Sequence, residues 1–477
     1  MTLSVLSVAS EAYPLVKTGG LADVVGALPA ALAPHDVEVT TMLPGYPAVA
    51  EAVAGGKLVC RWPDLLGAEA RLLAGRIGEH RLLVLDAPAL FARSGALYGL
   101  DDDWRRFAAL GRAAADLASG AVPSLRFDLL HAHDWQAAMA PAYLRLAPEP
   151  GPRAKSLVTV HNIAFQGQFG AEIFPQLELP ADAFSLGGVE YYGGVGFLKA
   201  GLQAADAITT VSPTYAAEIL EPRFGMGLEG LIQTRRARVF GIVNGIDPAV
   251  WNPASDGALP ARYTADHLWR RRENKRAVEK VFGLESGDGP LFTVISRLTW
   301  QKGMDVLAEC LDELVAQGGR LALLGSGDSH LEAAFKEAAA RHPGRIGVTI
   351  GYDEPLSHLL QGGADAILIP SRFEPCGLTQ LYGLAYGCVP IVARTGGLAD
   401  SVIDANLAAQ AAEVGTGFQC GEVSYPALSA TIARAIATFA DAERWETIQR
   451  NGMRADFSWA QSGRRYAQLY ASLMDAT

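Results

Sequence analysis

Short apolar, β-branched segments alternate with helical segments along this chain, and the alternation occurs in two separate series. The segments end in Gly, Asp, His or Pro, and helical stretches such as WRRFAALGRAAADLA, from Trp104, often follow. Strands that alternate with helices are typical of parallel sheets joined by right-handed crossovers. The sequence therefore predicts an α/β fold with two doubly wound domains. The first series is LSVLSVASE, VEVTTMLP, RLLVLDAP, FDLLHAHD, SLVTVHN, AITTVSP and RVFGIVNGID, and the second is PLFTVISRLTW, RLALLGSGD, RIGVTIGYD, DAILIPSRFEP and VPIVARTGG.

Composition and charge exclude several classes of protein and of partner. Half of the 477 residues are hydrophobic, which is enough for more than one core, and the net charge is −11. That charge argues against nucleic acid or an anionic membrane as the main partner. The five cysteines form no CxxC pair, so neither a disulfide framework nor a zinc ribbon is expected, and a reducing cytosol fits. The N-terminal segment is typical of a first strand rather than a signal peptide, and no apolar run is long enough to span a bilayer.

A polar, charged segment separates the two series. It reads PASDGALPARYTADHLWRRRENKRAVEKVFGL, and we place the domain boundary near residues 244–251. The last segment, FSWAQSGRRYAQLYASL from Phe457, is helical by its period. By itself this segment is compatible with closing the second domain or with crossing back to the first.

The six residues TGGLAD occur twice, after Lys17 and after Arg394, and each copy follows a predicted strand and precedes a helix. Glycines allow main-chain amides to face a ligand, and a helix N-terminus favours negative charge. Ligands of doubly wound sheets bind outside the carboxyl ends of the strands. We therefore expect each domain to present one such loop to a shared anionic ligand. The alternative is that both copies are packing turns.

Two further loops at strand ends carry charge. SRLTWQKG places Arg297 and Lys302 after a strand, where two cations suit the departing charge of a diphosphate. SRFEPCGLTQ places Glu374 on a loop that enters a helix, where a carboxylate can accept hydrogen bonds from sugar hydroxyls. The amides of Gly377, Leu378 and Thr379 could hold a phosphate at the helix start. The alternatives are ordinary surface cations and a carboxylate that responds to the helix dipole.

Histidines mark two other strand ends. TVHN places His161 beside Asn162, as an acid–base group, a donor to a sugar hydroxyl, or a structural histidine. HAHD sends His131 and His133 to the same side of a strand, but no further ligand completes a metal site, and Asp134 is a plausible sugar contact. GSGD at Gly325 lacks the third glycine of a dinucleotide fingerprint, and DDDW at Asp101 starts a helix, where capping is favoured over metal binding.

Together these segments resemble the bacterial glycogen synthase and plant starch synthase family over essentially the whole chain. The matching stretches are SEAYPLVKTGGLADVVGALP, LPGYP, HAHDWQA, TVHNIAFQG, TVSPTYAAEI, GIVNGID, ISRLTWQKG, RFEPCGLTQLYGLAYG, RTGGLADSV and the final FSWAQSGRRY. The resemblance implies a GT-B fold, in which two Rossmann-like doubly wound parallel-sheet domains face a deep inter-domain cleft. It also implies transfer of glucose from ADP-glucose to the non-reducing 4-hydroxyl of an α-1,4-glucan with retention of configuration, without a metal or other cofactor.

The resemblance further implies how the domains divide. The N-terminal domain, 1–243, would be the acceptor side and would be completed by a C-terminal crossover helix, 457–477. The C-terminal domain, 244–456, would bind ADP-glucose. The expected partners are ADP-glucose and glycogen or another α-1,4-glucan primer, in the bacterial cytoplasm; the oligomeric state stays open.

Roles carry over from the family residue by residue. The resemblance assigns catalysis to His161, Arg297, Lys302, Glu374 and Asp23. His161 would lie beside the reacting sugar carbon, Arg297 and Lys302 would neutralise the departing ADP, and Glu374 would hold glucose hydroxyls. It assigns substrate binding to Lys17, Gly19, Gly20, Tyr98, Asp134, Asn244 and Tyr352. From their places at a strand end and a helix start, Asn162, Gly377, Leu378 and Thr379 are also expected to bind substrate. Where the wider retaining GT-B pattern has a second glutamate, this chain has Tyr382.

Two other functions are compatible with the same architecture. A sucrose or trehalose-phosphate synthase would need extra cations for a sugar-phosphate acceptor, and the sequence shows no convincing set. A glucan-binding protein without catalysis would bind polymer without releasing ADP, but the retained Arg297, Lys302 and Glu374 argue against it.

Overall fold

The computed structural model describes residues 2–146 and 154–475, and the chain divides into two compact units. Unit 1, the N-unit, contains Met1–Gly245 and Trp459–Thr477, and unit 2, the C-unit, contains Ile246–Ser458. Both expected boundaries, after residues 243 and 456, lie two residues before these division points.

The N-unit is built on a nine-stranded sheet in the order β12-β11-β7-β6-β1-β2-β5-β4-β3. Seven strands from β12 to β5 are parallel, and β4 and β3 add an antiparallel edge. The strands are β1 Leu3–Val8, β2 Val37–Pro44, β3 Lys57–Trp62, β4 Ala70–Ile77, β5 His80–Asp86, β6 Leu129–His133, β7 Lys155–Val160, β11 Ala207–Thr210 and β12 Val239–Gly241. Parallel strands covered by helices on both faces are the predicted doubly wound arrangement.

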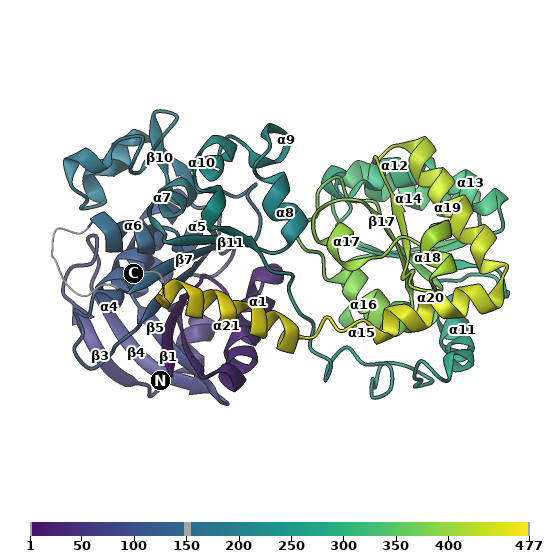
Figure 1. Cartoon of the computed structure of the whole chain (residues 1–477), viewed down its shortest axis with the longest axis horizontal. Helices are drawn as coiled ribbons and strands as arrows, with labels where there is room; N and C mark the ends of the chain where they lie inside the picture. The colour runs from purple at the N-terminus through teal and green to yellow at the C-terminus, as the bar shows by residue number, and fades with distance from the viewer. Residues whose placement is uncertain (1, 147–153, 476–477) are drawn as a thin grey trace. The chain divides into compact units, whose positions relative to one another are not determined.

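The helices of the N-unit cover this sheet (Figure 1). They are α1 Gly20–Leu32, α2 Pro47–Ala52, α3 Pro88–Phe91, α4 Asp103–Ala118, α5 Asp134–Ala137, α6 Met139–Leu146, α7 Phe197–Ala204, α8 Pro213–Glu218, α9 Pro222–Gly225, α10 Glu229–Thr234 and the C-terminal α21 Trp459–Asp475. A small antiparallel sheet joins β8 Gln168–Phe169, β10 Gly194–Gly196 and β9 Glu190–Tyr191. Neither β3 and β4 nor this small sheet was predicted from the sequence.

The last helix packs into the N-unit core. Tyr466, Leu469 and Tyr470 are buried in one cluster with Val5 of β1 and Leu28 of α1. Figure 1 shows α21 beside α1. Buried aromatic and leucine side chains supply about 1.5–3 kcal/mol each, so this segment is part of the N-unit core rather than an appended tail.

The C-unit sheet is entirely parallel, in the order β15-β14-β13-β16-β17-β18. Its strands are β13 Leu291–Ile295, β14 Arg320–Gly325, β15 Ile346–Ile350, β16 Ala366–Ile369, β17 Val389–Ala393 and β18 Phe418–Cys420. Its helices are α11 Arg271–Val281, α12 Met304–Glu309, α13 Leu311–Ala316, α14 Ser329–Arg341, α15 Glu354–Gly363, α16 Thr379–Tyr386, α17 Gly396–Ser401, α18 Leu407–Ala411, α19 Tyr425–Phe439 and α20 Ala442–Arg454.

Strand β14 shows why this sheet is apolar throughout. Leu321 and Leu323 belong to one buried cluster, and Ala322 and Leu324 belong to another. Because successive side chains of a strand point to opposite faces, each face of the sheet carries its own core.

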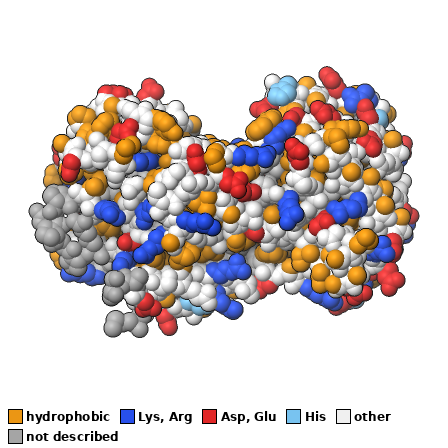
Figure 2. Space-filling view, turned by 45° about the horizontal axis from the view of Figure 1, so that its top comes forward, with side chains coloured by type: hydrophobic (Ala, Val, Ile, Leu, Met, Phe, Trp, Pro, Cys, Tyr) orange, Lys and Arg blue, Asp and Glu red, His pale blue; other side chains and the backbone are white. Residues whose placement is uncertain are grey.

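On the face of the molecule drawn in Figure 2, Lys and Arg side chains are interspersed with Asp and Glu.

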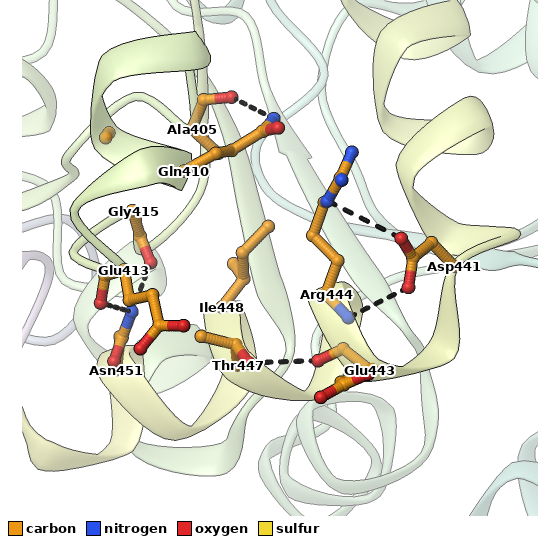
Figure 3. Close-up of a pocket in the computed structure, with 11 residues that line it drawn as sticks. Ala405, Gln410, Glu413, Gly415, Asp441, Glu443, Arg444, Thr447, Ile448 and Asn451 are labelled. Atoms are coloured by element: carbon orange, nitrogen blue, oxygen red, sulfur yellow. Dashed lines mark hydrogen bonds and ion pairs between the residues drawn. The ribbon is translucent and has the colours of Figure 1, made fainter.

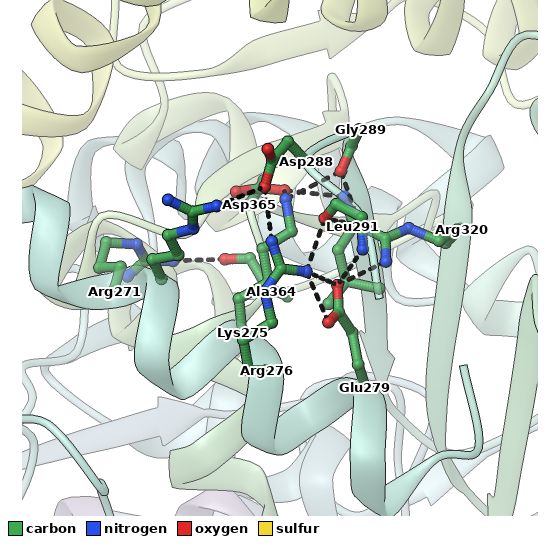
Figure 4. Close-up of polar contacts among 12 residues, drawn as sticks. Arg271, Lys275, Arg276, Glu279, Asp288, Gly289, Leu291, Arg320, Ala364 and Asp365 are labelled. Carbon is green, nitrogen blue, oxygen red and sulfur yellow. Dashed lines mark hydrogen bonds and ion pairs between the residues drawn. The ribbon is translucent and has the colours of Figure 1, made fainter. Parts of the chain in front are cut away.

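A network of buried charges fastens the segment before β13 to helix α11 (Figure 4). Arg320 and Glu279 are almost fully buried and form an ion pair of 2.5 Å. Arg320 also donates to the carbonyls of Gly287 and Gly289, at 2.9 and 2.8 Å. Lys275 of α11 pairs with Asp365 at 2.7 Å. The network satisfies main-chain carbonyls that helices and strands do not use.

We predict that Glu279→Ala destabilises the C-unit by about 3–5 kcal/mol, because it leaves the Arg320 guanidinium buried without its carboxylate. Urea-induced unfolding measures the loss. Glu79→Ala removes the partner of an exposed pair with Arg76 and should cost under about 1 kcal/mol. Equal midpoints for the two variants would contradict a structural role for the buried pair.

Candidate active site

The loop between β1 and α1 is held in place by a buried carboxylate, Glu11. Glu11 accepts hydrogen bonds from the main-chain amide and the hydroxyl of Thr18, the latter at 2.6 Å, and from the hydroxyl of Tyr98. The hydroxyls of Tyr98 and Ser10 are 2.8 Å apart. Burial raises the pKa of Tyr98, and Glu11 raises it further, so this hydroxyl stays protonated. Tyr98 is thereby tied to the first TGGLAD loop.

Lys17 and Gly19 lie on the exposed side of that loop. Lys17 Nζ is 2.7 Å from Asp23 Oδ1 and lies 5.6 Å from the centre of the Tyr13 ring. Gly20 begins α1, and an added Cβ at Gly19 would meet no atom within 4 Å. Since Gly19 is also in an extended conformation, nothing within the described parts of the chain requires a glycine there. The open space over Gly19 is what close approach by a ligand would need.

The second TGGLAD loop has a different environment, because its glycines are buried against the Glu374 segment. Added Cβ atoms at Gly396 and Gly397 would lie 2.0 Å from the carbonyl of Glu374 and 2.1 Å from that of Cys376. The amide of Gly397 donates to the carbonyls of Glu374 and Pro375. Close packing therefore requires these glycines, and the packing-turn alternative describes the second copy. Only the first copy presents its glycines on the surface.

His161 follows β7 and contacts the end of β6. Its Nε2 is 3.1 Å from Nδ1 of His133, whose Nε2 is 3.2 Å from the hydroxyl of Ser7. Burial lowers the pKa of His161 to about 3, so the ring is neutral at pH 7. The ring therefore offers hydrogen bonds rather than a positive charge.

Asp134, at the start of α5, holds the His161 loop. Its carboxylate accepts the main-chain amide of His161 at 2.7 Å. Burial raises the pKa of Asp134 to about 7, although the amides of His161 and Asn162 oppose the shift. Asp134 also has a φ of 55°, in the left-handed region. A non-glycine residue is rarely held there, and such strain is often found at functional sites.

Two asparagines complete the predicted residues of the N-unit. Asn162 Oδ1 accepts the amide of Ala164 at 3.0 Å, which forms a local turn. Asn244 lies just after β12 and is 5% exposed. Its side-chain oxygen has no hydrogen-bond partner within residues 2–146 and 154–475. A buried amide oxygen without a partner is unfavourable, so a ligand donor is a natural counterpart.

In the C-unit, Lys302 and Glu374 form an ion pair. The Lys302 Nζ to Glu374 Oε2 distance is 2.5 Å, and both side chains are largely buried. The hydroxyl of Ser371 donates to the same oxygen at 2.9 Å. The two loops are also joined through Gln301, whose carbonyl accepts the amide of Arg372 at 2.8 Å. The fold thus brings together two residues that lie far apart in the sequence.

Arg297 lies on the same strand-end loop but is exposed. Its guanidinium makes no hydrogen bond or ion pair with the parts of the chain that the structure describes. Arg372, which was not predicted from the sequence, is held in place by its neighbours. Its guanidinium donates two hydrogen bonds of 2.6 and 2.7 Å to Asp305 and lies 4.4 Å from the centre of the Trp300 ring. Of these two arginines, Arg297 is therefore the one whose guanidinium is open to an anionic ligand.

The remaining predicted residues of the C-unit lie on neighbouring loops. Gly377 has a φ of +70°, and Leu378 and Thr379 lie at the start of the eight-residue helix α16. Tyr352 follows β15, is 75% exposed, and its hydroxyl donates to Glu354 at 3.1 Å. The ring of Tyr382 stacks on that of Trp251, with centres 3.6 Å apart.

A surface pocket of about 240 Å³ between α18 and α20 contains none of these residues (Figure 3). Gln410, Glu413, Glu443, Arg444 and Asn451 line it, and Arg444 lies against Asp441. In the described ranges, no group of His, Cys, Asp or Glu side chains is arranged to hold a metal ion. No helix among them is long and apolar enough to cross a membrane.

Sequence reasoning missed Glu11, Ser371 and Arg372. Glu11 lies in SEAYP, directly after a strand and before a glycine loop, and a carboxylate in that position could have been recognised as a loop anchor. Ser371 and Arg372 stand beside Glu374 in SRFEP. Only the folded chain shows that one contacts Glu374 and the other holds Trp300.

Comparisons with known proteins agree over the whole chain. Residues 4–234 match the starch synthase catalytic domain family, and residues 276–451 match the glycosyl transferases group 1 family. A protein of Novosphingobium aromaticivorans described as glycogen synthase is 65% identical, and one of Rhizobium meliloti described as glycogen synthase 1 is 57% identical; both alignments cover 99% of each chain.

Two solved structures are similar to this chain over its whole length. The catalytic domain of starch synthase IV from Arabidopsis thaliana, bound to ADP and acarbose, aligns over 100% of both chains with a TM-score of 0.87 and 31% identity. A sucrose-phosphate synthase from Thermosynechococcus elongatus aligns over 100% of both chains with a TM-score of 0.61 and 18% identity. The second likeness concerns the fold alone.

Proposed function

This chain belongs to the glycogen and starch synthase family, and from that membership we propose that it transfers glucose from ADP-glucose to an α-1,4-glucan. The acceptor is the non-reducing 4-hydroxyl of the glucan, and the α configuration of the transferred glucose is retained. The observation that carries the proposal is full-length identity of 55–65% to proteins described as glycogen synthase. The starch synthase IV structure with ADP and acarbose bound supports the nucleotide and the glucan as ligands.

The C-unit provides the groups for the donor. Arg297 and Lys302 stabilise the charge that develops on ADP as the bond between glucose C1 and the β-phosphate oxygen breaks. Glu374 accepts hydrogen bonds from glucose hydroxyls, and the N–H groups of Gly377, Leu378 and Thr379 face phosphate. Tyr352 packs against the adenine. The ion pair between Lys302 and Glu374 supports this, because it places a cation and a sugar-binding carboxylate side by side.

The transfer itself balances without a further reagent. The bond from C1 to the phosphate oxygen breaks, the acceptor O4 bonds to C1 from the same face, and the proton of that hydroxyl passes to the phosphate of the leaving ADP. Since side-chain cations and ADP-glucose supply the charges and the glucosyl group, we propose that no metal or other cofactor takes part. Metal dependence can be tested directly by assays in EDTA.

The N-unit provides the acceptor side and a donor-binding lysine. Lys17 binds donor phosphate, Gly19 and Gly20 leave space for it, and Asp23 orients Lys17 through their ion pair. His161, neutral at pH 7, offers its ring and its main-chain carbonyl to the transferred glucose. Asp134 and Asn162 shape the His161 loop, Tyr98 lies beside the Lys17 loop, and Asn244 offers an oxygen that no described residue bonds.

Radiolabel transfer from ADP-glucose to glycogen tests the function. We expect label in polymer precipitated by ethanol, ADP released in equal amount, and much slower transfer from UDP-glucose. Transfer to a sugar phosphate rather than to polymer would support the sucrose-phosphate synthase alternative. Retention of the protein by glycogen without any ADP release would support a binding protein.

We place the enzyme in the bacterial cytoplasm. All five cysteines are free, and Cys310, Cys376, Cys388 and Cys420 are buried. Free thiols are typical of proteins in a reducing compartment. Fractionation of cells with an antibody to the protein tests this placement.

A further inference from the structure

An exposed apolar surface lies on the N-unit where three segments meet. It consists of Phe165 in the loop after β7, Tyr192 in the turn between β9 and β10, and Met226 after α9; we call it the Tyr192 surface. The three side chains are 57%, 76% and 41% exposed. Large apolar side chains that gather on a surface usually mark a binding site.

Hydrogen bonds hold the three segments together. The carbonyl of Met226 accepts Gln166 Nε2 at 3.0 Å and the hydroxyl of Tyr191 at 3.4 Å. An added Cβ at Gly227 would lie 3.3 Å from the hydroxyl oxygen of Tyr192, so that ring lies beside the 226–227 turn. The rings of Tyr191 and Tyr192 meet edge to face, with centres 4.7 Å apart. The surface is therefore built by the fold rather than by one stretch of sequence.

The backbone conformation of Tyr192 indicates that its side chain has a function. Tyr191 pairs with Gly194, so Tyr192 and Gly193 form a two-residue hairpin turn with φ values of 49° and 80°. Asn, Asp and Gly are strongly preferred at the first position of such a turn. A tyrosine there costs backbone strain, and its ring, although it packs on Tyr191 and beside the 226–227 turn, is still 76% exposed and open to a ligand.

The surface continues from the candidate active site. The amide of Phe165 donates to the carbonyl of Asn162 at 3.2 Å, so Phe165 lies one turn beyond His161 and Asn162. Aromatic rings present a negative face, which the C–H face of a sugar ring complements, while nearby polar groups can bond the sugar hydroxyls. Glu190 and Gln166 lie beside the rings and could act in this way.

We propose that the Tyr192 surface is a subsite for the α-glucan acceptor, which holds glucose units behind the non-reducing end that reacts. This inference rests on the proposed function for the identity of the ligand. A subsite of this kind raises affinity for polymer and leaves the binding of ADP-glucose unchanged.

Tyr192→Asn tests the subsite, because asparagine is the residue that the turn prefers. We expect the KM for glycogen to rise about three- to tenfold, in the range of one lost aromatic contact. The KM for ADP-glucose should not rise, and the melting temperature should not fall. Tyr192→Phe keeps the ring and should restore the KM for glycogen. Leu186→Ala, at a side chain 82% exposed in the same unit, should change neither constant.

Migration in native gels cast with glycogen gives a second readout that needs no catalysis. Wild-type protein should be retarded by glycogen more than Tyr192→Asn. An unchanged KM and equal retardation of the two proteins would overturn the subsite, and would leave this surface to a protein partner. If wild type shows no glucosyl transfer, the proposed function fails, while the comparison in gels still decides whether Tyr192 binds glucan.

Discussion

Lys302→Ala is expected to lower kcat for glucosyl transfer by about 10²- to 10³-fold, the usual effect of removing one group that stabilises developing charge. The physical reason is that Lys302 is fixed at the strand-end loop by Glu374, which the Ser371 hydroxyl holds in turn, next to where glucose hydroxyls are proposed to bind. Initial rates with ADP-glucose and glycogen at saturation measure the effect.

The same substitution leaves the buried Glu374 without its cation, so a loss of stability must be separated from a loss of catalysis. Lys302→Ala combined with Glu374→Gln removes the unpaired charge. The double variant should therefore have a higher melting temperature than Lys302→Ala alone, but an equally low kcat. Lys336→Ala, at an exposed lysine of α14, is the matched control and should leave both unchanged. A kcat near that of wild type in Lys302→Ala would end the assignment of this lysine to the departing ADP.

Arg297→Ala is expected to lower kcat by about 10²-fold or more without changing the melting temperature. Arg297 differs from Lys302 because its guanidinium is exposed and holds no other described part of the chain. Catalysis and stability therefore separate cleanly at this position. Rates in a single turnover should fall as far as the steady-state rates do, which shows that the transfer step itself is affected.

Arg272→Ala provides the control for Arg297, since Arg272 is an exposed arginine of the same unit on α11, with 71% of its side chain accessible. We expect wild-type kcat and KM from this variant. If Arg297→Ala raised only the KM for ADP-glucose and left kcat alone, Arg297 would contribute to ground-state binding rather than to stabilisation of the leaving group.

The class of fold could be predicted from local pattern. Apolar runs such as RLALLGSGD are continuous because both faces of a parallel strand are buried, and β14 shows that arrangement. The edge strand β3 and its neighbour β4 were not predicted. Their half-exposed residues, as in Lys57–Trp62, lack a continuous apolar run and depend on pairing with β5.

The roles within the candidate site were predictable only in part. Asp134 is predicted as a sugar contact, and the fold adds a contact that the sequence did not predict: its carboxylate accepts the amide of His161. The two TGGLAD loops look alike in sequence, yet one is open at Gly19 and the other is packed on Glu374. Identical residues diverge here because burial depends on what the rest of the fold places against them.

The sequence by itself determined the alternation of strands and helices, the strand-end position of the charged loops and the family, because these depend on local periodicity and on ordered motifs. Tertiary structure alone decided that Lys302 pairs with Glu374, that Glu11 anchors the Lys17 loop, and that Tyr192 is exposed on a turn that favours asparagine. The physical reason is that contact, desolvation and exposure arise between segments far apart in the chain, and no local pattern records them.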